Sequence, residues 1–180
     1  MPDFRLLLVG NTDGSAGGCT LRRGGHQDLQ VVCMRQDGFE GEVKLVVEGL
    51  PAGVTCAPQA IGPKQKDTSL VLSATDSAAD WAGAITIKGV AMIDGKSVTR
   101  EARPGCVVWP SPLNTPSISR TAQSLFLAVR EKGIYSIEPE KPEMEVCIGN
   151  RLTFKLKMKK HVKDTRGNVQ CVRISTPVLT

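Results

Sequence analysis

Apolar and polar residues alternate over several short segments in the first half of the chain. Residues 28–34 and 42–48 are the clearest cases, and a turn containing Gly38 separates them. A period of two places every second side chain on the same face, as in a half-buried β-strand. The expected apolar faces are Leu29, Val31 and Cys33 in the first segment and Val43, Leu45 and Val47 in the second.

Further strands are predicted on both sides of this pair. Asp94-Gly95 is typical of a two-residue hairpin loop, and it separates the long segment 81–91 from the returning segment 98–100. The other predicted strands lie between turn residues, at 5–9, 19–22, 54–56 and 68–74. Such a succession of short strands predicts an antiparallel β-sandwich.

Part of this pattern occurs a second time. Residues 24–35 align with 149–160, so that Leu29 lies over Phe154, Val31 over Leu156 and Cys33 over Met158. Residues 41–51 align with 167–177, and residues 6–9 align with 125–129. A repeat this long indicates tandem domains rather than a solenoid, whose repeats span a few tens of residues.

The two copies have unequal lengths. The first continues to about residue 103, whereas the second stops three residues after Pro177, without counterparts of the strands predicted at 54–56, 68–74, 82–91 and 98–101. We therefore predict tandem immunoglobulin-like antiparallel β-sandwiches of which the second is incomplete. The expected divisions are a sandwich at 1–103, a Pro-rich linker at 104–122 and a partial second repeat at 123–180.

A family resemblance rests on the segment from Gly38 to Ala74. The string Gly38-Phe39-Glu40-Gly41-Glu42-Val43-Lys44-Leu45, the string Gly49-Leu50-Pro51-Ala52-Gly53-Val54 and the later Leu70-Val71-Leu72-Ser73-Ala74 carry it. It resembles the immunoglobulin-like β-sandwich repeats of large exported and surface-attached bacterial proteins, often found beside pre-peptidase C-terminal or protease domains. The resemblance implies a non-catalytic spacer or adhesion-type module.

Composition agrees with a β-rich, globular chain. Aromatic residues make up only 4% of the 180 residues, and the net charge of +5 is spread along the sequence. A modest basic charge does not by itself indicate a specific nucleic-acid site. No apolar run reaches the ~18 residues that a membrane-spanning helix needs, and the N-terminus lacks the features of a signal peptide. We expect a piece of a longer protein with an extracellular, periplasmic or cell-surface location.

The six cysteines do not indicate a disulfide framework. No CxxC occurs, and Cys33 and Cys171 align with apolar residues of the other copy, Met158 and Leu45. We interpret them chiefly as small, buried apolar side chains, with room for one isolated bridge.

No combination of residues predicts catalysis. The two histidines, His26 and His161, lack further ligands at zinc-site spacing. Asp76 and Asp80 could share a calcium ion, although an isolated pair of acidic residues in a loop is usually just solvated. The Gly-rich stretch 11–18 lacks the Gly-Lys-Ser/Thr ending of a phosphate loop. We predict no catalytic, cofactor-binding or metal-ligating residue and no enzyme activity, with an unrecognised active site as the opposing hypothesis.

One basic stretch is a candidate contact. Lys155, Lys157 and Lys159 alternate with Phe154, Leu156 and Met158, so the lysines share one face of a strand predicted at 151–159. Solvation accounts for such a face, and lysines also discourage edge-to-edge aggregation. The functional alternative is contact with an anionic polymer.

The sequence therefore predicts a non-catalytic spacer or interaction module of a larger bacterial surface protein. The alternative is a carbohydrate- or anionic-polymer-binding accessory module of a secreted hydrolase or protease; Trp81, Trp109 and Tyr135 are its candidate aromatics. Expected partners are other domains of the same protein and a second copy bound through unpaired strand edges. No membrane span, cofactor or specific nucleic-acid partner is expected.

Overall fold

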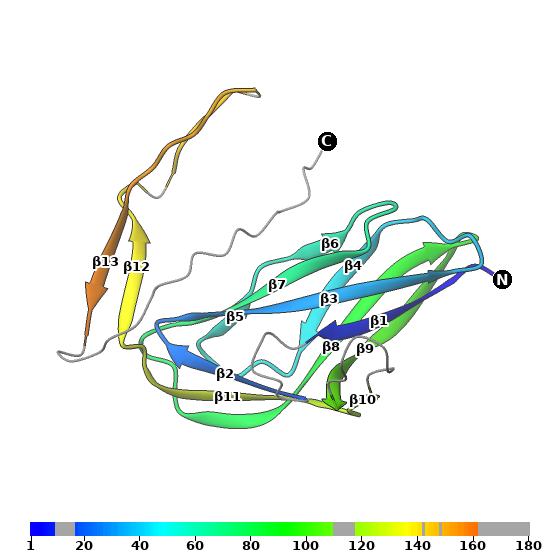
Figure 1. Ribbon diagram of the computed structural model, residues 1–180, viewed down its shortest axis with the longest axis horizontal. Helices are drawn as coiled ribbons and strands as arrows, with labels where there is room; N and C mark the ends of the chain where they lie inside the picture. Colours follow the sequence, from blue (N-terminus) through cyan, green and yellow to red (C-terminus); the bar gives the residue numbers. More distant parts are fainter. Residues whose placement is uncertain (10–16, 110–117, 142, 148, 162–180) are drawn as a thin grey trace.

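The computed structural model describes residues 1–9, 17–109, 118–141, 143–147 and 149–161 (Figure 1). Every regular element in these residues is a β-strand, so the predicted all-β class is confirmed. The strands are β1 (Asp3–Val9), β2 (Gly18–Arg23), β3 (His26–Gln36), β4 (Val43–Glu48), β5 (Val54–Cys56), β6 (Gln59–Ile61), β7 (Asp67–Ala74), β8 (Trp81–Ile93), β9 (Lys96–Trp109), β10 (Ile118–Thr121), β11 (Leu125–Lys132), β12 (Tyr135–Pro139) and β13 (Leu156–Lys160).

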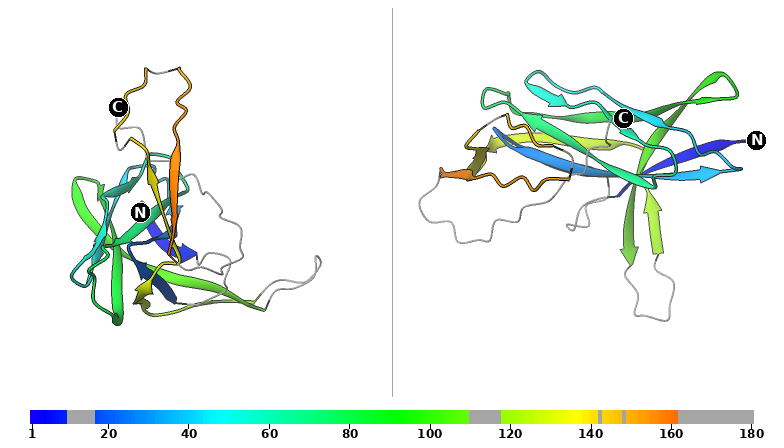
Figure 2. Two further views of the ribbon diagram at one scale, coloured as in Figure 1. Left: turned by 90° about the vertical axis from the view of Figure 1, so that its left-hand side faces the viewer. Right: turned by 90° about the horizontal axis from the view of Figure 1, so that it is seen from above.

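The strands β1 to β9 and β11 form two layers around one hydrophobic core. In one layer the order is β1-β3-β7-β5, with antiparallel pairing throughout. In the other layer β8 pairs with β4, with the first part of β9 and with β11, while β6 borders β4 and β2 borders β11. Figure 2 shows these layers from two further directions.

Strand β9 belongs to both layers. Residues 96–101 pair antiparallel with β8, and residues 102–105 pair parallel with β1. Its beginning is fixed by the predicted hairpin loop, in which Asp94 and Gly95 both have positive φ, as a two-residue type I′ turn requires. Because β9 departs from β8 in this way, residues 81–85 of β8 pair with β11 instead.

The alternating apolar side chains of the predicted strands point into the core, and the polar side chains between them point to the surface. The predicted inner residues of β3, which are Leu29, Val31 and Cys33, are buried, as are Val43 and Leu45 of β4. They meet the inner side chains of the other strands, among them Phe4, Leu6, Leu8, Leu70, Leu72, Ile85 and Ile87. Burial of these apolar side chains is the main force that holds the layers together.

Arg35 closes one end of this core. Its guanidinium donates hydrogen bonds to the carbonyls of Gly41 (2.5 Å), Gly62 (2.7 Å) and Gln65 (3.2 Å) and lies 5.1 Å from the centre of the Phe39 ring. Phe39 stacks in turn on Phe4 at 5.4 Å. A Cβ on residue 41 would lie 2.9 Å from the Phe39 ring, which explains the glycine there. The Gly-Phe-x-Gly string is therefore a packing motif.

Three features differ from the predicted arrangement. The β1–β9 and β2–β11 ladders are parallel, so the body is not purely antiparallel. Strands β6, β10 and β12 were not predicted. Residues 104–109 and 118–121, assigned to the Pro-rich linker, are paired strands of β9 and β10, because the backbones of these two segments bond to each other across the β9–β10 ladder.

Strand β11 also departs from the expected domain division. It was assigned to the second unit, beginning at residue 123, yet Leu125, Leu127 and Val129 are buried in the same core as the strands of the first unit. The physical reason is that the segment of β8 left without β9 offers β11 a partner and an apolar face. Residues 162–180 of the predicted second unit lie outside the described part of the chain.

We predict that Arg35→Lys lowers the free energy of unfolding by about 1–3 kcal/mol, because lysine keeps the charge but cannot reach three carbonyls at once. Denaturant titration measures this change. Arg103→Lys, at an exposed position of β9, is the matched control and should alter stability little. Equal effects of the two substitutions would contradict the role of Arg35.

A second prediction concerns β11. Leu127→Ala should destabilise the whole body by about 2–5 kcal/mol, because this side chain is buried in the shared core. Its neighbour Phe126 is 57% exposed, so Phe126→Ala serves as the control and should have a small effect. If thermal unfolding of Leu127→Ala leaves the main transition in place, β11 does not belong to this core.

Candidate interaction surface

Strands β12 and β13 form a sheet of their own beside the body. We call residues 135–160 the arm, and Figure 1 shows its strands standing away from the two layers. The arm follows β11 through Gly133, whose amide donates to the carbonyl of Arg23 at 3.3 Å. At the same end the amide of His161 donates to the carbonyl of Ile134 at 2.8 Å. These bonds define the base of the arm; the residues between its strands form the tip.

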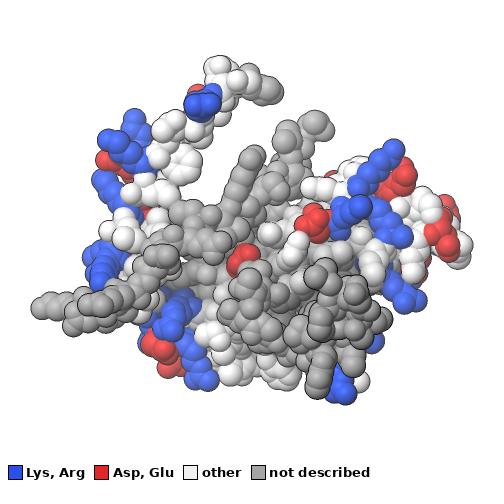
Figure 3. Space-filling model, in the orientation of Figure 1, with Lys and Arg blue, Asp and Glu red and all other residues white. Residues whose placement is uncertain are grey.

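The predicted lysines lie together on one face of the arm. Lys157 and Lys159 belong to β13, Lys155 directly precedes it, and all three are exposed. The same face carries acidic residues, however, because Glu138 is the cross-strand partner of Lys157, and the Lys157 ammonium lies 3.5 Å from the Glu140 carboxylate. Figure 3 shows basic and acidic side chains side by side on this part of the surface. The lysine face is therefore partly neutralised.

The other face of the arm is mostly apolar, although it also carries Lys160, the cross-strand partner of Tyr135. Ile137 pairs with Met158 and Pro139 with Leu156, so these side chains share a face with Tyr135. Leu156 is 47% exposed and Met158 is 60% exposed. The strand is shorter than the predicted 151–159, and its apolar residues are not covered as their aligned counterparts in β3 are.

Ion pairs surround the base of the arm. The Lys132 ammonium lies 2.8 Å from the Asp76 carboxylate, and this hydrogen bond is the main cause that lowers the pKa of Asp76. Asp80 lies 3.8 Å from the Arg23 guanidinium. The two predicted calcium-ligand candidates are thus paired with separate cations. Within the described residues no group of three or more His, Cys, Asp or Glu side chains is placed to hold a metal ion.

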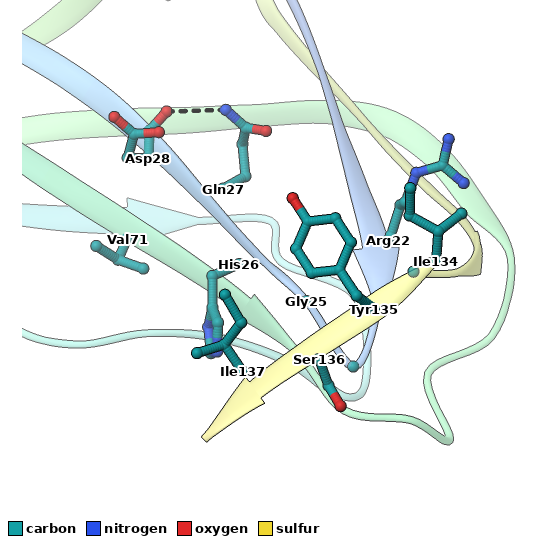
Figure 4. Close-up of a pocket in the computed structure, with 12 residues that line it drawn as sticks. Arg22, Gly25, His26, Gln27, Asp28, Val71, Ile134, Tyr135, Ser136 and Ile137 are labelled. Atoms are coloured by element: carbon teal, nitrogen blue, oxygen red, sulfur yellow. Dashed lines mark hydrogen bonds between the residues drawn. The ribbon is translucent and has the colours of Figure 1, made fainter. Parts of the chain in front are cut away.

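A cleft of about 540 Å³ opens between the arm and the outer face of the β3–β7 pair. Figure 4 shows Tyr135 and Ile137 pointing from β12 toward β3 and β7. Their counterparts across the cleft are Gln27, Asp28 and Val71. This volume suits a small ligand, and Tyr135 supplies its aromatic surface. Trp81, in contrast, packs partly buried against the core, and the side chain of Trp109 lies outside the described part.

The histidines each meet a serine on a neighbouring strand. His26 Nδ1 lies 2.9 Å from Ser73 Oγ, and these residues are direct cross-strand partners. His161 Nε2 lies 3.1 Å from Ser136 Oγ. The serines of both pairs are on strands, at their ladder positions rather than on a sharp turn. The prediction that the chain has no catalytic residue remains a prediction.

The described cysteine side chains are free thiols in different environments. Cys33 is buried, as predicted, whereas Cys19 and Cys56 are half-buried and Cys147 is exposed. Burial raises the pKa of Cys19 to about 11, so this thiol stays protonated at neutral pH. Cys171 and the side chain of Cys106 lie outside the described residues.

Neither the cleft nor strand β12 was predicted from the sequence. The segment 135–139 contains a single pair of alternating apolar residues, Tyr135 and Ile137, and it ends in a proline. Alternation was present, but it is too short to indicate a strand without its partner β13.

No family model matches the sequence, and no curated protein matches it. A similar solved structure is "Structure of surface layer protein SbsC, domains 1-6", with 12% sequence identity and a TM-score of 0.34. The similarity covers 89% of this chain and 22% of that one.

In the described part of the chain, no helix has the length and apolar character needed to cross a membrane.

If the lysine face contacts an anionic polymer, replacing Lys155, Lys157 and Lys159 with alanine should lower the salt concentration needed to elute the protein from an immobilised polyanion, since fewer counterions are exchanged. The matched control replaces Lys44, Lys64 and Lys96, which are exposed on the body, and loses the same charge. Equal elution of the two variants would show that net charge alone causes retention.

Proposed function

We propose that this chain is a non-catalytic, immunoglobulin-like module of a larger exported or cell-surface bacterial protein. It acts as a spacer or interaction module, and its mechanism is mechanical. The observation that carries the proposal is the order in which the body strands pair around their common core.

Immunoglobulin-type sandwiches have strands A, B, E and D in one sheet and C, F and G in the other. With β1 as A, β3 as B, β7 as E and β5 as D, the first layer has this order. With β4 as C, β8 as F and the first part of β9 as G, so has the second layer. The parallel β1–β9 ladder joins the first and last of these strands.

The resemblance found in the sequence occupies corresponding places. The Gly-Phe-x-Gly string forms the turn before strand C and is held by Arg35. The Gly-Leu-Pro-Ala-Gly string joins strands C and D, where Gly49 and Gly53 adopt positive φ. The two glycine-containing strings favour the same fold as the pairing order, since each glycine is required by local geometry.

The proposal includes two further predictions. The chain has a tandem arrangement with an incomplete second unit, and it has no enzyme activity.

The test follows the native protein in its source cells. An antibody raised against the purified chain should detect the protein in the exported or cell-surface fraction, and protease added to intact cells should remove that signal. A cytoplasmic marker, analysed in the same fractions, is the control for cell lysis.

A signal confined to the cytoplasm would overturn the location part of the proposal. A metal or organic cofactor that copurifies in stoichiometric amount would instead favour the enzyme hypothesis, and mass spectrometry under native conditions detects it.

A further inference from the structure

The cleft between the arm and the body has an aromatic side chain on one wall and polar side chains on the other. Tyr135, which is 41% exposed, and Ile137 project into it from β12, as Figure 4 shows. The opposite wall is the start of β3, where His26, Gln27 and Asp28 line the cleft. At about 540 Å³ the cleft has the size of a small-ligand site.

The polar wall is held in place by the sheet of the body. His26 and Asp28 pair with Ser73 and Val71 in the β3–β7 ladder. His26 Nδ1 lies 2.9 Å from Ser73 Oγ, and Gln27 Nε2 donates to the carbonyl of Asp28 at 3.1 Å. Among the described residues, nothing bonds to His26 Nε2 or Gln27 Oε1. These two atoms are therefore oriented in advance and remain for a ligand.

The aromatic wall is fixed where the arm joins the body. The amide of Gly133 donates to the carbonyl of Arg23 at 3.3 Å, and the amide of His161 donates to the carbonyl of Ile134 at 2.8 Å. Tyr135 follows directly after this joint and presents both a ring and a hydroxyl. No other described residue forms a hydrogen bond with that hydroxyl.

The side chains that line the cleft carry no net charge. With histidine neutral, Arg22 and Asp28 are the charged residues among them, and their formal charges cancel. The Arg22 guanidinium also lies 3.1 Å from the Glu131 carboxylate. A strongly charged ligand would lose hydration here without meeting an equal opposite charge. The cleft therefore favours an uncharged ligand.

An uncharged sugar ring matches both walls. A pyranose has a face of C–H groups, which packs on an aromatic ring, and hydroxyls at its edge, which both donate and accept hydrogen bonds. Tyr135 and Ile137 offer the apolar contact, and the carboxylate, amide and imidazole of the other wall offer the hydrogen-bond partners. A purely apolar ligand would leave these polar groups unpaired, at a cost in free energy.

We propose that the cleft binds one uncharged pyranose unit, with the sugar ring against Tyr135 and its hydroxyls bonded to His26, Gln27 and Asp28. The unit is a free sugar or one residue of a glycan, and the same chemistry recognises both. This site goes beyond the proposed spacer function and does not depend on it.

A label on tyrosine tests the proposal directly, because Tyr135 is the single tyrosine of the chain. The full chain containing meta-fluorotyrosine gives a fluorine NMR signal from this residue alone. We expect the signal to shift during titration with glucose, galactose, mannose or N-acetylglucosamine, or with their oligosaccharides. A shift with oligosaccharides alone would identify a glycan as the ligand, and a shift with the free sugars would show that one unit suffices.

Substitutions on both walls locate the sugar, and isothermal titration calorimetry with the sugar that gives the largest shift measures them. Tyr135→Ala and Asp28→Asn should each raise the dissociation constant about tenfold or more, whereas Tyr135→Phe, which keeps the ring, should change it less. The controls are Phe154→Ala, which removes an exposed aromatic ring of the arm outside the cleft, and Asp94→Asn in the hairpin loop. Both should leave the affinity unchanged.

Three results would overturn the proposal. The first is a fluorine signal that no uncharged sugar shifts. The second is a shift caused only by glucuronic acid or only by adenosine, the probes for an anionic and for a flat aromatic ligand. The third is unchanged affinity of either Tyr135→Ala or Asp28→Asn. Asp28 belongs to the body, so its substitution tests the site without altering the arm, and circular dichroism confirms that each variant is folded.

Discussion

The change of partner in strand β9 is the constraint on which the described structure depends. The strand pairs with β8 up to Glu101 and with β1 from Ala102, so one continuous backbone holds both layers together. The first half of β8 would otherwise present unpaired backbone groups, which are costly when they are shielded from water. Strand β11 supplies their partners, brings β2 with it and places three more apolar side chains in the core.

The position of the arm follows from this arrangement. Because β11 lies against β8, the chain leaves the body at Gly133, beside the turn between β2 and β3. Two ion pairs lie beside the point where the chain leaves the body, one between Lys132 and Asp76 and one between Arg22 and Glu131. Exposed pairs of this kind contribute little stability. The cleft exists because β12 then rises over the outer face of β3 and β7.

At the opposite end of the body, the side chain of Arg35 holds two turns together. Arg35 satisfies three backbone carbonyls that belong to two separate turns, and its guanidinium covers the ring of Phe39. Lys160 occupies the aligned position in the arm, where the Gly-Phe-x-Gly string is also missing.

The sequence by itself determined most strands of residues 1–103 and which side of each of these strands is apolar. The bounds of β5 and the hairpin at Asp94-Gly95 were predicted as the structure has them, because local turn geometry and a period of two are properties of neighbouring residues. The tertiary structure decided which strands pair, that residues 104–109 continue β9 and that Leu125, Leu127 and Val129 join the first core. It also decided that Leu156 and Met158 lie exposed while Val31 and Cys33 are buried. A side chain is buried only when another apolar face lies opposite it. The alternation within one strand does not show which strand or sheet will lie there.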